Sequence, residues 1–163
     1  MEKKNLTLTW TEYPDESALE PGDRELLSAA RSASENAYAP YSGFFVGAAV
    51  RLENGQVITG SNIENAAFPS GICAERNALS SSAAQYPTVS PVAIAIAART
   101  RNGQTKGPVS PCGNCRQVMA EEEFRFGRNI RIILGGSSRI RVIEKCSDIL
   151  PLQFNRDDMK LIP

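Results

Sequence analysis

The 163-residue sequence predicts an α/β fold in which helices cover a β-sheet. Segments with apolar or small residues at helical spacing alternate with short apolar runs of strand length. Their order along the chain is α-β-β-α-β-α-β-β, which gives five expected strands and favours a sheet sandwiched between helices. The length and the 42% hydrophobic content suit a single domain with its own core.

The first expected elements are a helix and a β-hairpin. Residues 22–38 (GDRELLSAARSASENAY) have helical spacing, with Asp23 placed as the N-cap and Pro40 just past the end. Residues 44–52 (FFVGAAVRL) and 56–63 (QVITGSNI) have the composition of strands and flank a tight Asn-Gly turn. The sequence therefore predicts that these two strands pair.

The remaining elements follow in the same alternation. A helix rich in small residues is expected over 71–85, and the continuous apolar run 91–98 is typical of a strand covered on both faces. Residues 111–124 begin with proline and carry a helical pattern. Two more strands are expected over 129–136 and 139–145, joined by a Gly-Gly-Ser-Ser turn.

Domain organisation and location are also bounded by the sequence. We expect an N-terminal arm over residues 1–22 and a single catalytic domain over residues 23–163. No stretch approaches the roughly 18 apolar residues of a membrane span, and no apolar region follows the basic start, so no signal peptide is expected. A cytoplasmic protein follows, in which the four cysteines are free thiols, metal ligands or catalytic groups.

Charge and histidine content exclude several functions. A formal net charge of zero argues against a nucleic-acid binder, which needs clustered Lys and Arg. The absence of histidine rules out Ser-His-Asp and Cys-His machinery and every histidine-ligated metal site. Any general base must be a carboxylate, a lysine, a tyrosine or a cysteine.

Three cysteines indicate a zinc site. Cys112 and Cys115 form a CxxC at an expected helix start, where residues three apart share a face. Cys73 lies at another expected helix start, and the helix dipole lowers the pKa of thiols there. Three thiolates suit Zn²⁺ and leave one tetrahedral position open, as a catalytic zinc requires.

Other interpretations of these cysteines stay open at this point. The CxxC alone is also compatible with a redox pair or with half of a zinc ribbon. Cys146 could close the site and make the zinc structural, but it has no CxxC partner, and we expect a single half-buried thiol.

The residues after the first cysteine suggest an acid–base group and a charge modulator. Glu75 can reach a water in the open zinc position, take its proton and return it to a leaving group. The alternative is a glutamate that merely stabilises the helix dipole. Zn²⁺ with three thiolates carries net negative charge, so Arg76 first and Arg116 second are expected to donate to thiolate sulfur.

Together these motifs resemble a known enzyme family. Ligand-x-Glu followed by P-C-x-x-C is the signature of zinc-dependent deaminases, and it stands here as CAE and PCGNC. With AYAPYSGFFVGAA and GSNIENAAFPSGICAERNA, the sequence resembles the homotetrameric three-cysteine branch of the cytidine/deoxycytidylate deaminase superfamily over residues 23 to 155.

The resemblance implies a fold, a reaction and an assembly. The fold would be a three-layer α-β-α sandwich with a five-stranded mixed sheet. The reaction would be hydrolytic deamination of cytidine and 2′-deoxycytidine to uridine and 2′-deoxyuridine plus ammonia, in pyrimidine salvage. One Zn²⁺ per subunit and a homotetramer with active sites completed by neighbouring subunits are implied as well.

The resemblance also implies substrate contacts. Phe44, Asn62 and Glu64 match positions that grip the nucleoside, and an amide plus a carboxylate suits a ribose hydroxyl. Backbone groups at Ala74 and Ser110 match those that bind the pyrimidine edge. As alternatives, Phe44 is a plain core aromatic, Asn62 a turn residue and Glu64 a solvated charge.

Two further residues bear on the resemblance. Phe154 matches an aromatic that covers the base from a neighbouring subunit, although it could equally be an ordinary core or interface residue. Phe68 stands where many family members place a tyrosine, so a hydrogen bond from that hydroxyl is absent here.

The expected partner is a small-molecule nucleoside, without nucleic acid or membrane. Two rival functions remain: a deaminase of another aminated heterocycle, and a structural zinc or RNA-binding module. The second rival needs Cys146 as a fourth ligand and a basic face.

Overall fold

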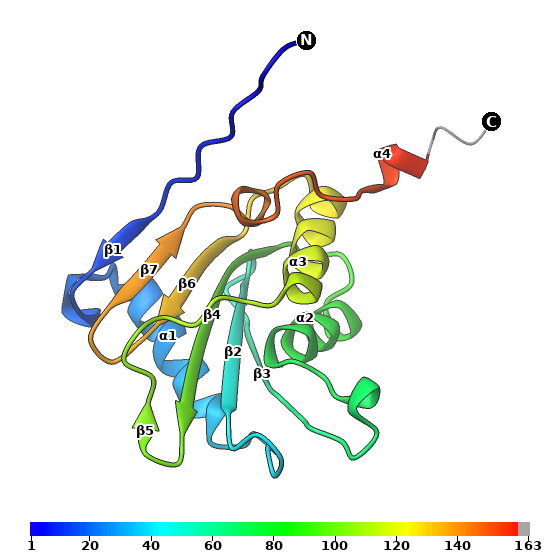
Figure 1. Cartoon of the computed structure of the whole chain (residues 1–163). Helices are drawn as coiled ribbons and strands as arrows, with labels where there is room; N and C mark the ends of the chain where they lie inside the picture. The colour runs from blue at the N-terminus through cyan, green and yellow to red at the C-terminus, as the bar shows by residue number, and fades with distance from the viewer. Residues whose placement is uncertain (160–163) are drawn as a thin grey trace.

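One continuous β-sheet organises the protein, with helices on both of its faces (Figure 1). The computed structural model describes residues 1–159. Strand order is β1-β7-β6-β4-β2-β3, and β5 pairs with β4 outside this path. The strands are β1 Thr11–Tyr13, β2 Phe45–Leu52, β3 Val57–Ser61, β4 Pro91–Thr100, β5 Gly103–Gln104, β6 Arg131–Gly135 and β7 Ile140–Ile143.

The five predicted strands are present, and the mixed character of the sheet is confirmed. Strands β4 and β6 are parallel, whereas every other pair is antiparallel. The predicted number of five strands is wrong, because the sheet has seven within residues 1–159. Strands β1 and β5 are three and two residues long, too short for an alternating pattern to reveal them.

The helices form two layers. The α-helices are α1 Pro21–Ser34, α2 Ala74–Gln85, α3 Gly113–Phe126 and α4 Arg156–Met159, and the 3₁₀ turns are η1 Glu16–Ala18, η2 Phe68–Ser70 and η3 Cys146–Ile149. Helix α1 packs on one face of the sheet, and α2 and α3 pack on the other. The predicted α-β-α sandwich is therefore confirmed.

Alternation along the central strands feeds two cores. In β4, Ile94 and Ile96 face α2 and α3, whereas Ala93, Ala95 and Ala97 face α1. Small residues on the α1 face allow that helix to lie close to the sheet, and larger residues fill the space under the other two helices. This explains why the whole run is apolar.

Two glycines set how closely the helices approach. A Cβ added at Gly47 in β2 would lie 2.0 Å from the Ala30 carbonyl oxygen of α1. One added at Gly60 in β3 would lie 2.4 Å from the Ala78 nitrogen of α2. Since real Cβ contacts of this length do not occur, both positions require glycine, and Gly60 fixes the distance between α2 and the sheet.

The start of α1 differs from the prediction. Helix α1 begins at Pro21 with Glu20 as its N-cap, three residues before the expected N-cap Asp23. Proline at the first helical position has the required φ and no N–H to satisfy. Asp23 is instead buried and accepts a hydrogen bond from Arg131 Nε at 2.8 Å, while Arg51 Nη2 lies 3.5 Å away.

The N-terminal segment is only partly separate from the domain. The start of the chain extends away from the body in Figure 1, but Trp10 lies against Arg141, β1 pairs with β7, and Leu19 is buried in the core beneath α1. Residues 11–22, which we expected to belong to an arm, thus contribute to the sheet and the core. Among the described residues, no helix has the length and apolar character needed to cross a membrane.

Candidate active site

A cavity of about 470 Å³ opens where β3 ends and where α2 and α3 begin. It is lined by Tyr41, Phe44, Val46, Asn62, Ile63, Glu64, Asn65, Phe68, Gly71, Ile72, Cys73, Ala74, Glu75, Ile96, Val109, Ser110 and Cys112. Eight of the residues predicted from the sequence to hold metal, move a proton or bind substrate belong to this lining. The chain thus brings together groups from positions 44 to 112.

Three cysteines meet at one end of the cavity. Cys73 is the N-cap of α2, Cys112 is the N-cap of α3, and Cys115 lies in the first turn of α3. The Sγ atoms of Cys73 and Cys112 are 3.9 Å apart, those of Cys112 and Cys115 are 3.3 Å apart, and all three lie within 4.8 Å of one another. Tetrahedral zinc with Zn–S bonds of about 2.3 Å needs sulfurs about 3.8 Å apart, so the three thiols fit Zn²⁺.

The thiols influence one another's ionisation. A hydrogen bond from Cys115 lowers the pKa of Cys73 to about 6, and the charge of Arg76 acts in the same direction, whereas burial and Glu75 oppose. The same hydrogen bond, together with burial, raises the pKa of Cys115. A bound metal ion would displace the remaining thiol protons, because a metal is ligated by thiolates.

Glu75 is buried beside the cysteines. It is the second residue of α2, lines the cavity and is only 5% exposed. Burial raises the pKa of its carboxyl group, while hydrogen bonds from its own backbone N–H and from Cys115 act in the opposite direction. A carboxylate with a raised pKa can both accept and return a proton near neutral pH.

The two arginines differ in what they touch. The charge of Arg76 lowers the pKa of Cys73, whereas its expected hydrogen bond to thiolate sulfur stays a prediction. Arg116 instead donates from Nε to the Pro111 carbonyl and from Nη1 to the Ile149 carbonyl, both at 2.9 Å. The predicted donation from Arg116 to thiolate sulfur is thus replaced by a bridge between two backbone segments.

Cys146 does not belong to the cluster. Its side chain is fully buried rather than half-buried, and its Sγ donates to the Arg116 carbonyl at 3.3 Å. Within residues 1–159, the only group of three or more potential ligands is Cys73, Cys112 and Cys115. The fourth-ligand alternative, which the structural zinc module requires, is therefore excluded.

Asn62 and Glu64 line the cavity and also hold its walls. Asn62 accepts from Val46 N at 2.7 Å through Oδ1 and donates to the Phe44 carbonyl at 3.0 Å through Nδ2. Glu64 Oε2 accepts from Tyr41 N at 2.9 Å and Ser42 N at 3.2 Å. Hydrogen bonds from the Ser42 side chain and from these backbone groups lower the pKa of Glu64. Each side chain keeps further capacity: Asn62 has a second N–H and a second lone pair, and Glu64 has its Oε1.

The other predicted contacts separate into two groups. Phe44, Ala74 and Ser110 line the cavity, but Phe154 does not. Phe154 is 61% exposed, and its carbonyl accepts from Gln117 Nε2 at 2.7 Å. In its own chain Phe154 therefore has no contact with this site.

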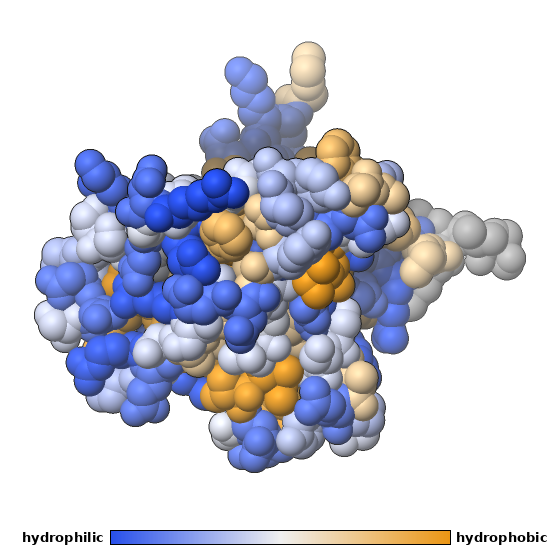
Figure 2. Space-filling view, turned by 90° about the horizontal axis from the view of Figure 1, so that it is seen from below, coloured by the Kyte–Doolittle hydropathy of each residue, from blue (hydrophilic) through white to orange (hydrophobic). Residues whose placement is uncertain are grey.

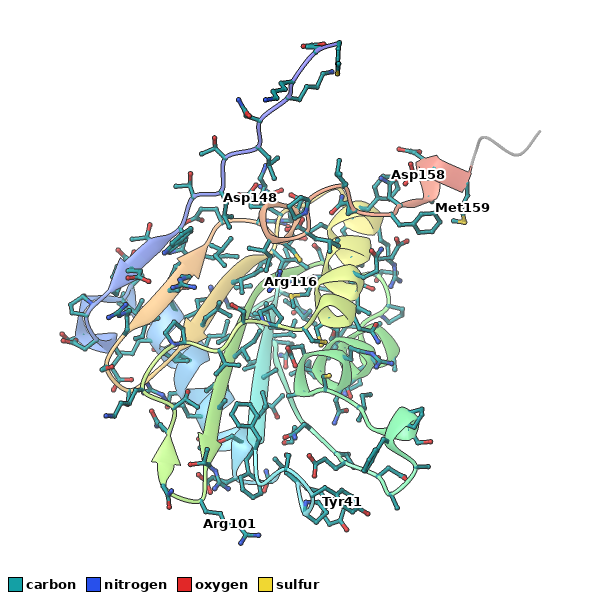
Figure 3. The ribbon with its side chains drawn as sticks, viewed as in Figure 1. Tyr41, Arg101, Arg116, Asp148, Asp158 and Met159 are labelled. Carbon is teal, nitrogen blue, oxygen red and sulfur yellow. The ribbon has the colours of Figure 1, made fainter. Side chains whose placement is uncertain are left out.

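Two aromatic side chains form an apolar rim of the cavity, and of these the sequence pointed to Phe68 but not to Tyr41. Tyr41 and Phe68 form an edge-to-face pair with ring centroids 5.7 Å apart, and both are more than half exposed. Tyr41 is labelled at the lower end of the molecule in Figure 3. Figure 2, which views the protein from below, shows exposed apolar side chains among polar ones. Residues 38–45 are rich in aromatic side chains, which is the only sign of Tyr41 in the sequence. This composition does not show that Tyr41 lies at the cavity, because the path of the loop cannot be read from it.

Comparison with known proteins decides the family. The family model for the cytidine and deoxycytidylate deaminase zinc-binding region matches residues 21–127. The chain belongs to this family. Zinc is therefore its cofactor, and the three-cysteine cluster at the cavity is where it fits.

Individual relatives agree with this assignment. A cytidine deaminase from Halalkalibacterium halodurans is 42% identical over 138 residues, covering 84% of this chain and 98% of the relative. One from Mycobacterium tuberculosis is 33% identical over 80% of this chain and 87% of the relative. The crystal structure of a cytidine deaminase from Burkholderia pseudomallei, 40% identical, superposes with a TM-score of 0.67 over 80% of this chain and 97% of that one.

Proposed function

We propose that the cavity is where this chain deaminates cytidine and 2′-deoxycytidine to uridine and 2′-deoxyuridine, releasing ammonia. The observation that carries the proposal is the buried Glu75 carboxylate beside a cluster of three thiols at the wall of one cavity. The likeness to proteins named cytidine deaminase over most of the chain gives the reaction class.

Cys73, Cys112 and Cys115 would hold one Zn²⁺ per subunit. Held by these thiolates, the ion would supply Lewis-acid chemistry that lowers the pKa of a water molecule. The positive ends of α2 and α3 and the charge of Arg76 stabilise the thiolates. These residues therefore prepare the site for attack by water.

Glu75 would move the protons of the reaction. Its carboxylate takes a proton from the attacking water and delivers it to N3 of the pyrimidine, while the water oxygen bonds to C4. The remaining proton then passes to the exocyclic amine, the C4–N bond breaks, and ammonia leaves. One carboxylate acts first as base and then as acid, so the reaction needs no histidine.

The remaining lining would hold the nucleoside. Asn62 and Glu64, already ordered by backbone hydrogen bonds, present their unused capacity to a ribose hydroxyl. Phe44 would pack on the nucleoside, and backbone groups at Ala74 and Ser110 would bind the pyrimidine edge. The described lining contains no Lys or Arg, which favours a nucleoside over a nucleotide.

The assembly and the cellular setting are part of the same proposal. We propose a homotetramer in which Phe154 of a neighbouring subunit covers the base, because Phe154 is exposed and lies outside the cavity of its own chain. We also propose residues 23–163 as the catalytic domain, supported by β1 and η1 from the preceding segment, in a cytoplasmic enzyme of pyrimidine salvage.

The decisive experiment follows the ultraviolet absorbance of cytidine with purified protein. We expect Glu75→Ala to retain zinc and to lose about 10²–10⁴-fold in turnover, since general acid–base groups contribute that much. Glu121→Ala, a change of an exposed carboxylate on α3, is the matched control and should keep full activity.

Two results would contradict the proposal. A Glu75→Ala enzyme as fast as wild type would remove Glu75 from the mechanism. A zinc-loaded wild type that leaves cytidine and deoxycytidine unchanged would favour another aminated heterocycle as substrate.

A further inference from the structure

Arg116 joins two segments that are far apart in the sequence. Its Nε donates to the Pro111 carbonyl and its Nη1 to the Ile149 carbonyl, each at 2.9 Å. Figure 3 places Arg116 near the start of α3, with Asp148 of the C-terminal turn above it. One guanidinium group thus bridges the turn before Cys112 and the 3₁₀ turn η3.

The contact with Pro111 bears directly on a metal ligand. Proline has no N–H, so its carbonyl is its only backbone hydrogen-bonding group. The peptide between Pro111 and Cys112 is planar, and fixing its carbonyl oxygen therefore fixes the Cys112 nitrogen and Cα as well. Pro111 is buried and is followed by Cys112, whose Sγ lies 3.9 Å from Cys73 and 3.3 Å from Cys115.

The other end of the bridge rests on a firm anchor. Glu123, only 9% exposed, accepts hydrogen bonds from the backbone N–H groups of Cys146 at 2.7 Å and Ser147 at 3.1 Å. The same carboxylate accepts from Ile130 N at 2.8 Å. Cys146 Sγ also donates to the Arg116 carbonyl at 3.3 Å. Helix α3 therefore contacts η3 at two points, through Arg116 in its first turn and through Glu123 farther along the helix.

We propose that Arg116 is a positioning residue for the metal site. It ties the Pro111–Cys112 peptide to η3 and so holds the Cys112 sulfur where it meets the other two ligands. The planar guanidinium donates in two directions at once, which a lysine ammonium on a flexible stem does not reproduce. The role differs from neutralisation of thiolate charge, which any cation at this position would perform.

The inference rests on the proposed metal site but not on the proposed substrate. Zinc affinity can be measured by competition with a chromophoric chelator without any nucleoside, so failure of the substrate assignment leaves this test intact. Cobalt(II) bound in place of zinc adds a spectroscopic readout, because its visible bands depend on the arrangement of the thiolates around it.

Three variants distinguish the positioning role of Arg116 from the effect of its charge and from a general loss of stability. Arg116→Lys keeps the charge and loses the double contact, whereas Arg116→Gln loses both. Arg125→Lys is the matched control, since Arg125 is also on α3 and donates to a backbone carbonyl, that of Pro87 at 2.6 Å, away from the metal ligands. All are measured at a temperature well below each variant's thermal midpoint.

We expect Arg116→Lys and Arg116→Gln to bind zinc at least about tenfold more weakly, the usual cost of losing a partner that orients a ligand. Their cobalt(II) bands should shift, and Arg125→Lys should match wild type in both measurements. An Arg116→Lys protein with zinc affinity within twofold of wild type would overturn the proposal in favour of charge. Weaker binding with an unchanged cobalt spectrum would also overturn it.

A second variant keeps the test decisive if the Arg116 variants do not fold. Glu123→Gln preserves the shape of the side chain but weakens its bonds to Cys146 N and Ser147 N, so the anchor of Arg116 is loosened. We expect a smaller shift of the cobalt(II) bands in the same direction. A wild-type spectrum for Glu123→Gln would overturn the proposal.

Discussion

The four cysteine side chains differ in what surrounds each sulfur. Those of Cys73, Cys112 and Cys115 face one another at two helix starts. Cys146 has no exposed surface and donates its thiol proton to a backbone carbonyl. The same residue type therefore serves as a candidate metal ligand in three places and as a core residue in the fourth.

Burial predicts that Cys146 is chemically inert in the folded protein. It raises the pKa of Cys146 from 9.0 to about 12, so only about one molecule in 10⁴ carries the thiolate at pH 8. We expect no alkylation of Cys146 by iodoacetamide in native protein and full alkylation after unfolding, read by mass spectrometry. Labelling of native Cys146 at the rate of a free thiol would contradict this.

The same shift determines a pH dependence of stability. Between pH 9 and 12 the unfolded chain loses the Cys146 proton while the folded chain keeps it, so ionisation favours unfolding as pH rises. Cys146→Ala removes this contribution. The free energy of unfolding should therefore fall less steeply above pH 9 in the variant than in wild type, and equal slopes would argue against the shift.

At the scale of elements, the sequence predicted the helices and strands with a periodic hydrophobic pattern. It did not predict the shortest strands or the hydrogen bonds between residues far apart in the chain. Five strands, three long helices and the two helix starts that carry the thiols follow from periodicity and motif. Strands β1 and β5 contain too few residues to show a period. The bonds from Glu123 to Cys146 and Ser147 span 23 and 24 positions, and no local pattern in the sequence encodes such pairs.

The packing of α2 against β3 predicts a coupled loss of stability and activity. Gly60→Ala places a Cβ 2.4 Å from the Ala78 nitrogen. Because this atom belongs to the backbone of α2, it cannot move aside as the end of a flexible side chain would. We expect a destabilisation of about 1–3 kcal/mol. Because Cys73 is the N-cap of α2 and Glu75 lies in its first turn, zinc affinity and turnover should fall as well.

Two further glycine variants test this interpretation in denaturant titrations and activity assays. Gly47→Ala meets the Ala30 carbonyl oxygen at 2.0 Å, but on the α1 side of the sheet. It should lower stability while leaving the zinc affinity of the folded protein close to wild type. Gly107→Ala has open space and should be neutral. Equal loss of zinc affinity in the Gly47 and Gly60 variants would show that the effect is global.

At the scale of the whole molecule, the first ten residues and the segment from Pro151 to Met159 lie outside the central sandwich. The N-terminal segment is tied to β7, where Arg141 Nη2 donates to Glu12 at 2.8 Å and its guanidinium lies 5.0 Å from the Trp10 ring centre. The C-terminal segment runs past α3 and exposes Leu152, Phe154 and Met159 (Figure 1). Exposed apolar side chains close together in sequence are typical of a surface that another chain covers.

If Phe154 completes the cavity of a neighbouring subunit, two defective chains should rescue each other. Glu75→Gln lacks the proton carrier but supplies an intact Phe154, and Phe154→Ala lacks the aromatic but keeps Glu75. Each homo-oligomer should be impaired, whereas co-expressed chains should recover activity in those sites that combine a wild-type Glu75 with a wild-type Phe154. The recovery is measured by comparing the turnover of oligomers purified from separate expression with that of oligomers purified from co-expression. Sedimentation establishes the size of each oligomer. Joint activity equal to the average of the two parents, or a fully active monomer, would place Phe154 outside the catalytic assembly, because neither outcome needs a second chain at the site.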